Sequence, residues 1–394
     1  MTAAVVIVLF CAAWTLWVIA GYPVWLAVRG RFFERPLDRG PYEPTITAVI
    51  PVHNGVQFLA AKLNSVLASD YPTAKLDLLV LSDASSDGTD VEAEEYARRF
   101  PDRVRFRRLP RGGKASALSA ALIEVNADVL LFTDVRQRLH PSCVRHLAET
   151  LHDPSVGVVS GNLKILSGES TGEANVGLYW RYESWIRSNL SRTDSLMGAT
   201  GPIYAMRRTL TRTLPAGCIL DDVWLPMQAV LAGYRSVLEE KAIAWDYPTS
   251  LNAEFARKVR TQAGLFQLTW QLPGIFSSRN RLRAPFLFCK LGRLLLPEVL
   301  LVCLVASLWL PSEIRWPAVA GQFAFYGLAV LDPWIGETSV AKRLTAPVRA
   351  FVVLLAAALF AISIFFIEPE RLWKHTQVRT PNSGQSSSEP GDSE

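Results

Sequence analysis

Charged residues end several apolar stretches in the middle of the chain, at places where they could do chemistry. In VLLFTDVRQ (residues 129–137), an apolar run closes on Asp134, and Arg136 follows two positions later. A carboxylate at the end of a strand is a typical ligand for a divalent cation that binds phosphate, although such sites often offer two acids. Here the second place holds a guanidinium, which can bind a phosphate directly. An acid and a cation therefore share one candidate phosphate site.

Two adjacent carboxylates, Asp221 and Asp222, precede a segment with apolar residues at helical spacing. Acids in the first turn of a helix complement its dipole, which is the simplest explanation for one of them. The other could be a general base, which needs only hydrogen-bond distance to an acceptor hydroxyl. Because adjacent side chains cannot both face one site, we expect one acid in each role.

Three further motifs could bind a nucleotide. Asp83 begins DASSDGTD and could accept hydrogen bonds from a ribose or a uracil, although the same residues also suit a plain turn. RGGKA places two glycines at a helix start, where free N–H groups favour a phosphate and Lys114 supplies a countercharge. Arg257 and Arg260 lie in a basic amphipathic segment that could contact either lipid head groups or a diphosphate.

Alternating strand-like and helix-like patterns between residues 45 and 165 position these groups. The strand-like runs are TITAVIPV (45–52), KLDLLVLSD (75–83), VRFRRL (104–109), DVLLFTD (128–134) and GVVSGNL (157–163). Helical patterns between them predict an α/β fold with a mainly parallel sheet and helices on both faces. Ligands of such sheets bind beyond the carboxyl ends of the strands, where Asp83 and Asp134 are expected.

Apolar segments at both ends predict an integral membrane protein. Residues 2–28 contain no charge, and this run exceeds the ~20 residues that cross a bilayer. Without a clear cleavage site, we expect a retained anchor rather than a signal peptide. The arginines that follow it place the next residues in the cytoplasm. Apolar runs at 294–310, 316–331 and 350–367 predict two or three further spans.

The predicted organisation has four parts. They are an N-terminal transmembrane anchor (1–29), a cytoplasmic α/β domain (45–285), a C-terminal transmembrane region (286–368) and a disordered tail (380–394). We expect the cytoplasmic membrane as the location and its lipids as partners. The net charge of +5 is modest and partly due to arginines that flank the membrane, so no nucleic-acid partner is expected. The five cysteines show no paired spacing, which argues against a zinc site or disulfide framework.

The order of motifs resembles the membrane-anchored family-2 glycosyltransferases, the group of cellulose-, chitin- and hyaluronan-synthase-like enzymes with the GT-A fold. The resemblance covers about residues 45–270 and rests on AVIPVHNG, LLVLSDASSDGTD, GGKA, LFTDVRQ, GVVSGNL, GATGPIYAMRR, LDDVWLP and RKVRT in that order. It implies an inverting transfer of a sugar from a nucleotide sugar, first of all a UDP-sugar, to a polysaccharide or other glycan.

The resemblance also implies roles for single residues. Asp222 matches the catalytic base, Asp221 matches its partner acid, and Asp134 matches the first acid of an Asp-x-Asp motif that binds Mg²⁺ or Mn²⁺. The donor-binding positions that it implies are Pro51, Val52, Asp83, Lys114, Arg257 and Arg260.

Three residues depart from the pattern of this family. Arg136 replaces the second acid of the metal motif, Arg257 replaces a Gln, and Thr261 replaces the Trp on which an acceptor sugar would stack. The first change leaves three alternatives: a divalent ion held by Asp134 and phosphate oxygens, direct contact of Arg136 with the diphosphate, or an Arg136 that faces solvent. We favour the first alternative. The loss of the Trp argues against processive polymerisation.

Competing functions remain open at this stage. Within the same class, the acceptor could be a lipid phosphate or a lipid-linked sugar, since membrane spans suit both acceptor types. From a different class, a membrane subunit that binds a nucleotide sugar without catalysis would also tolerate the altered motifs. A small transporter ranks last, because the apolar runs carry few charges.

Overall fold

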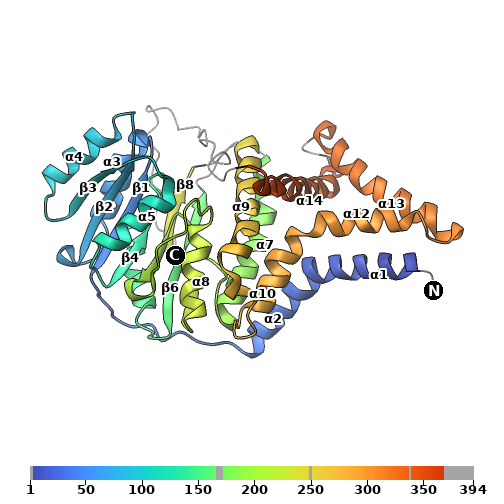
Figure 1. Cartoon of the computed structure of the whole chain (residues 1–394), viewed down its shortest axis with the longest axis horizontal. Helices are drawn as coiled ribbons and strands as arrows, with labels where there is room; N and C mark the ends of the chain where they lie inside the picture. Colours follow the sequence, from blue (N-terminus) through green and yellow to red (C-terminus); the bar gives the residue numbers. More distant parts are fainter. Residues whose placement is uncertain (1–2, 166–171, 248–250, 337–338, 368–394) are drawn as a thin grey trace.

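An eight-stranded mixed sheet forms the core of the chain (Figure 1). The computed structural model describes residues 3–165, 172–247, 251–336 and 339–367. The strands are β1 (Ile46–Val52), β2 (Leu76–Asp83), β3 (Val104–Leu109), β4 (Val129–Phe132), β5 (Arg138–Leu139), β6 (Val156–Ile165), β7 (Tyr204–Arg207) and β8 (Arg235–Asp246). They follow the order β3-β2-β1-β4-β7-β6-β8-β5. The first four strands of this order, β3, β2, β1 and β4, are mutually parallel, and β7 is antiparallel to both of its neighbours.

The α/β fold class is confirmed, and the predicted strands correspond to β1, β2, β3, β4 and β6. The sequence analysis did not predict β5, β7 and β8. β7 and β5 bring the antiparallel pairings β4–β7, β6–β7 and β5–β8, whereas β8 pairs in parallel with β6. Six of the eight strands therefore run in the same direction.

Helices cover both faces of this sheet. They are α3 (Val56–Leu67), α4 (Thr89–Arg99), α5 (Gly113–Glu124), α6 (Cys143–Thr150), α7 (Gly172–Thr193), α8 (Asp221–Leu231) and α9 (Leu251–Gln271), with short 3-10 turns at η2 (Thr73–Lys75), η3 (Arg208–Leu210) and η4 (Pro273–Phe276). Successive residues of a strand point to opposite faces. Val49 and Leu79 accordingly belong to one core cluster with residues of α5 and α8, whereas Ala48 and Leu78 belong to another with residues of α3 and α6. Burial on both faces explains why these strands are continuously apolar.

The first helix contains a π-helical turn within an otherwise α-helical segment. It consists of α1 (Ala3–Leu16), η1 (Trp17–Gly21) and α2 (Tyr22–Phe32). At the other end of the described chain follow α10 (Arg283–Pro285), η5 (Phe286–Leu291), α11 (Gly292–Leu294), α12 (Leu296–Ser307), α13 (Ser312–Leu331), η6 (Asp332–Trp334), α14 (Lys342–Ala361) and η7 (Ile362–Phe365). Figure 1 shows α1, α12 and α13 extending away from the sheet on the side of α7 and α9.

Two helices among the described residues are long and apolar enough to cross a membrane: Ala3–Phe32 and Lys342–Phe365, each with a mean hydropathy of 2.5. Within the predicted C-terminal region 286–368, Lys342–Phe365 is the described helix that meets this criterion, and α12 is apolar but shorter. Two or three C-terminal spans stay a prediction. The predicted tail 380–394 lies outside the described residues.

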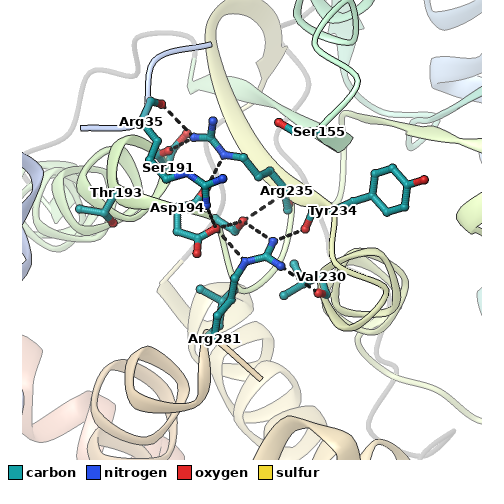
Figure 2. A network of polar contacts seen from close by, with 12 residues as sticks. Arg35, Ser155, Ser191, Thr193, Asp194, Val230, Tyr234, Arg235 and Arg281 are labelled. Atoms are coloured by element: carbon teal, nitrogen blue, oxygen red, sulfur yellow. Dashed lines mark hydrogen bonds and ion pairs between the residues drawn. The ribbon is translucent and has the colours of Figure 1, made fainter. Parts of the chain in front are cut away.

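A network of arginines fixes the linker after α2 to the α/β domain (Figure 2). The guanidinium of Arg235, which is 3% exposed, donates hydrogen bonds to the backbone oxygens of Arg35, Ser191 and Asp194 at 3.1, 3.1 and 2.9 Å. Arg281 donates to the Asp194 carboxylate at 2.8 Å. Because a buried guanidinium satisfies several carbonyl groups at once, Arg235 on β8 joins the linker at Arg35 to the C-terminal end of α7.

Candidate active site

Polar residues meet where β1, β2 and β4 end. Asn54 follows β1 and Ala84 follows β2, and among the described residues these two are the non-glycine residues with positive φ, at 51° and 53°. Such conformations cost energy and cluster at functional sites. The Asn54 side chain accepts a hydrogen bond from the Ser86 N–H at 2.8 Å, so the loops after β1 and β2 are joined.

Asp83 holds the RGGKA loop. Its carboxylate accepts hydrogen bonds from the N–H groups of Gly112 at 2.7 Å and Gly113 at 3.1 Å, and it pairs with Arg111 at 2.6 Å. The residue is 5% exposed. A nucleoside would therefore have to share carboxylate oxygens that already accept hydrogen bonds, and the predicted nucleoside contact remains a prediction. Val52 is 3% exposed and belongs to a core cluster, whereas Pro51 is partly exposed.

Lys114 lies between two of the predicted acids. Its ammonium group is 2.9 Å from the Asp134 carboxylate and 3.2 Å from that of Asp221. Burial disfavours the charged form, but the carboxylates of Asp134, Asp221 and Asp222 hold the pKa of Lys114 above its ordinary value. The structure thus places Lys114, Asp134 and Asp221 together, and the roles predicted for them stay predictions.

Asp221 and Asp222 begin α8 and differ in environment. Asp221 is 4% exposed, and burial raises the pKa of its carboxyl. Asp222 is partly exposed; burial and the neighbouring Asp221 raise the pKa of its carboxyl to about 7, while Lys114 acts in the opposite direction. A carboxyl that titrates near neutral pH suits a general base.

The GATG segment shapes the surroundings of Asp222. The N–H of Ala199 donates a hydrogen bond to the Asp222 backbone oxygen at 2.7 Å. A Cβ added to Gly201 would lie 2.8 Å from an oxygen of the Asp222 carboxylate, closer than side chains tolerate. Glycine at position 201 therefore lets this carboxylate lie against the backbone.

Arg136 does not present an unbalanced charge to the site. Its guanidinium pairs with the Asp246 carboxylate at 2.6 Å, and the Gln137 amide donates to the same oxygen at 2.9 Å. Asp246 ends β8 and is 4% exposed. The sequence analysis missed Asp246, and it carries no motif that would have revealed it.

The donor set fits a divalent ion only in part. Asp134, with its side chain 36% exposed, offers one carboxylate that Lys114 already contacts. Among the described residues, no group of three or more His, Cys, Asp or Glu side chains could hold a metal ion. A Mg²⁺ or Mn²⁺ ion would therefore be held by Asp134 together with phosphate oxygens of a bound nucleotide.

A buried lysine fixes the loop that carries Asp134. The ammonium group of Lys62, on α3, donates to the Thr133 hydroxyl and the Gln137 backbone oxygen. Burial lowers the pKa of Lys62 to about 7. Lys62 lies in a helical apolar pattern in the sequence, which gave no signal of this role.

The basic segment of α9 reaches the acids. Burial lowers the pKa of Arg260, whereas the carboxylates of Asp134 and Asp222 raise it, so this guanidinium lies in their field. Arg257 lies one turn earlier and is partly buried. The Thr261 hydroxyl donates to the backbone oxygen of Arg257 at 2.9 Å and is thus used within its own helix.

Arg187 contacts two motifs of the sequence, GVVSGNL and GATG. From α7, its guanidinium donates to the hydroxyls of Ser160, in GVVSGNL, at 2.9 Å and of Thr200, in GATG, at 3.1 Å. Its pKa is lowered by burial and raised by Asp222, among others, so it lies near the candidate base. The sequence analysis did not predict a role for Arg187, because no recognisable motif surrounds it.

The mixed sheet with helices on both faces has the GT-A fold. A solved structure of the mannosyltransferase PcManGT from Pyrobaculum calidifontis, in complex with GDP-Man and Mn²⁺, shares the fold with a TM-score of 0.67 and 21% identity over 90% of this chain and 99% of that chain. Residues 47–214 match the model of Glycosyl transferase family 2.

Proteins of rhizobia are also similar in sequence to parts of this chain. An N-acetylglucosaminyltransferase of Rhizobium leguminosarum bv. viciae is 26% identical over 51% of this chain and 50% of that protein. Another, of Sinorhizobium fredii, is 25% identical over 72% of both chains. This chain thus spans about half the length of the first of these relatives.

Proposed function

We propose that the chain transfers a sugar from a nucleotide sugar to an acceptor hydroxyl, with inversion at the anomeric carbon. The observation that carries this proposal is the position of Asp222, a partly exposed carboxyl with a pKa near neutrality, beside the cations Lys114 and Arg260. A base and a cationic diphosphate site at one sheet edge are the two parts that such a transfer requires.

In the proposed reaction, the Asp222 carboxylate removes the proton of the acceptor hydroxyl. The hydroxyl oxygen attacks the anomeric carbon from the side opposite the diphosphate, and the bond between that carbon and the phosphate oxygen breaks. The nucleoside diphosphate leaves with the electron pair, and its charge is balanced by Lys114, Arg260 and Arg257. A divalent ion at Asp134 would supply further positive charge to the same oxygens.

Several finer points belong to this proposal. A UDP-sugar is the first donor to test, on the resemblance of Pro51, Val52 and Asp83 to nucleoside-binding positions, and GDP-mannose is the second, because the PcManGT structure contains it. The two apolar helices support a membrane-bound enzyme whose α/β domain faces the cytoplasm, as the arginines after residue 28 indicate.

The test is nucleotide release by the purified full-length protein with a panel of UDP- and GDP-sugars, with and without chelator. Asp222→Asn should abolish acceptor-dependent release and keep donor binding, which is measured by titration. Retained turnover in Asp222→Asn would remove the base from its assigned role. Donor binding without release for every donor would instead favour a non-catalytic subunit.

The acceptor has two candidates, a glycan and a lipid-linked compound. The candidate spans suit both, but Thr261 in place of a stacking Trp argues against a long polymer. Product length, measured by mass spectrometry, separates a single transfer from chain extension.

A further inference from the structure

A buried amide on α9 contacts the loop that leads into the candidate base. Gln267 is 3% exposed. Its Oε1 accepts a hydrogen bond from the Ile219 N–H at 2.9 Å, and its Nε2 donates to the Gly217 backbone oxygen at 2.8 Å. A side-chain amide offers one acceptor and one donor group, and here both are used on the same loop. Gln267 therefore holds the chain two residues before Asp221.

The backbone of α9 also approaches this loop closely. A Cβ added to Gly264 would lie 2.5 Å from Cγ of Leu220, closer than side chains tolerate. Gly264 precedes Gln267 by three positions, so both lie on the same face of α9. One face of α9 thus meets the loop through a hydrogen-bonding side chain and through a close packing contact.

The first turn of α8 lacks the side-chain cap that often fixes the start of a helix. Leu220 occupies the N-cap position and makes no side-chain hydrogen bond there. A Ser, Thr, Asp or Asn at this position would accept a hydrogen bond from an N–H group of the first turn. The contacts of the preceding loop, together with the hydrogen bond from Ala199 to the Asp222 backbone oxygen, are left to set where Asp221 and Asp222 lie.

Helix α9 is itself packed against the C-terminal helical segment α14–η7 (Figure 1). The rings of Phe266 and Trp270 lie 5.5 and 5.4 Å from the ring of Phe365, and the ring of Phe255 lies 6.0 Å from that of Phe360, between centroids. Side chains of a site keep their geometry best when the element that supports them is locked by packing. Helix α9 is therefore a packed support for the loop before the acids.

We propose that Gln267 is a positioning residue of the transfer reaction: its amide fixes loop 217–220 and thereby the place of the Asp222 carboxylate beside the acceptor hydroxyl. This inference rests on the proposed function, in which Asp222 is the base. A base must lie within hydrogen-bond distance of the proton that it removes, and a displacement of about 1 Å can cost about a hundredfold in rate. Gln267 acts through Asp222, so it affects the rate of transfer and leaves donor affinity unchanged.

The test compares Gln267→Met with the unmodified full-length protein. Methionine has about the length of glutamine but leaves the Ile219 N–H and the Gly217 oxygen without this partner. Amide hydrogen exchange in residues 217–222, followed by mass spectrometry, should become about tenfold faster, as expected for the loss of one hydrogen bond. The kcat for acceptor-dependent transfer should fall by about tenfold to a hundredfold, with donor affinity unchanged. A purely structural role would lower the Tm and leave kcat per donor-binding site unchanged, which would overturn the proposal.

Gly264→Ala is a second variant, which acts on the same loop without removing a hydrogen bond. Alanine favours a helix more than glycine does, so the change supports folding of α9, while its Cβ displaces Leu220. It should lower kcat by about tenfold, again with donor affinity unchanged. An unchanged kcat in this variant would contradict the role of α9 in placing the acids.

The matched control is Gln271→Met, one turn further along α9, where the side-chain oxygen accepts no hydrogen bond from the described residues. It should keep both the exchange rates of residues 217–222 and kcat. A loss of kcat equal to that of Gln267→Met would show a general effect of α9 and overturn the proposal. If no donor supports nucleotide release, the proposed transfer fails, whereas unchanged exchange in Gln267→Met refutes the hold of Gln267 on the loop. The two failures are therefore distinguishable.

Discussion

The titration of Asp222 gives a direct test of its role as the base. With a pKa of about 7, roughly a tenth of the molecules carry the carboxylate at pH 6 and roughly nine-tenths at pH 8. Because only the carboxylate can accept the proton, kcat/KM for acceptor-dependent transfer should rise about tenfold between these pH values. The rise should level off above pH 8, since Lys114 keeps its proton throughout this range.

The assay follows nucleotide release at low acceptor concentration from pH 5.5 to 8.5, together with donor affinity at each pH. Asp102→Asn, at an exposed carboxylate outside the site, is the matched control and should keep the full rise. A flat profile in the unmodified enzyme, with donor affinity constant, would refute the assignment of the base. So would an undiminished rise in Asp222→Asn.

The same raised pKa has a consequence for stability. The folded-state pKa lies above the unfolded value of 3.8, so the folded protein binds more protons between about pH 4 and pH 7 and loses stability as pH rises through that window. Asp222→Asn removes a costly buried charge and should raise the free energy of unfolding at pH 8, by at most about 4 kcal/mol. The gain should vanish below about pH 4, which thermal unfolding at both pH values measures.

Three other substitutions test the remaining parts of the site. Lys114→Met should weaken donor binding, which a donor titration measures. It should also shift the midpoint of the pH profile upward, because Lys114 lowers the pKa of Asp222. Gly201→Ala places a Cβ 2.8 Å from the Asp222 carboxylate, which must then move. This change should lower kcat by about tenfold to a hundredfold and leave donor affinity unchanged. An unchanged kcat would contradict the close packing of Gly201 against Asp222. Arg136→Ala should destabilise the fold by about 3–5 kcal/mol in thermal unfolding, because it leaves the buried Asp246 carboxylate without its partner, and the double change with Asp246→Asn should recover most of this loss.

The sequence predicted the N-terminal half of the sheet well because its strands are buried on both faces. β1 and β2 are continuous apolar runs between helical patterns, and the positions where they end were visible. β7 has four residues and lies inside a motif with two glycines, and β8 contains the charged run Glu239, Glu240 and Lys241. Neither has a periodic pattern, and pairing with β6 fixes them only once the sheet exists.

Site residues could be predicted from the sequence where a charged residue directly follows an apolar strand or begins a helix. Asp83, Lys114 and Asp134 were expected at one edge, and the contacts of Lys114 join Asp134 to Asp221. Residues that act through a distant partner were not predictable. Asp83 meets the glycines of the RGGKA loop 29 residues later, and Arg187 meets Ser160 and Thr200 from a separate helix.

Arg136 shows why the charge of a site cannot be summed along the sequence. The replacement of an acid by an arginine makes the segment more positive by two units, which favours direct binding of the diphosphate. In the folded chain, β8 brings Asp246 against Arg136 across 110 residues of sequence and offsets that charge. The cation that pairs with Asp134 is instead Lys114, from the first turn of α5. Because the Lys114 ammonium group is 2.9 Å from the Asp134 carboxylate, we predict that any metal dependence responds to substitution of Lys114 more than to substitution of Arg136.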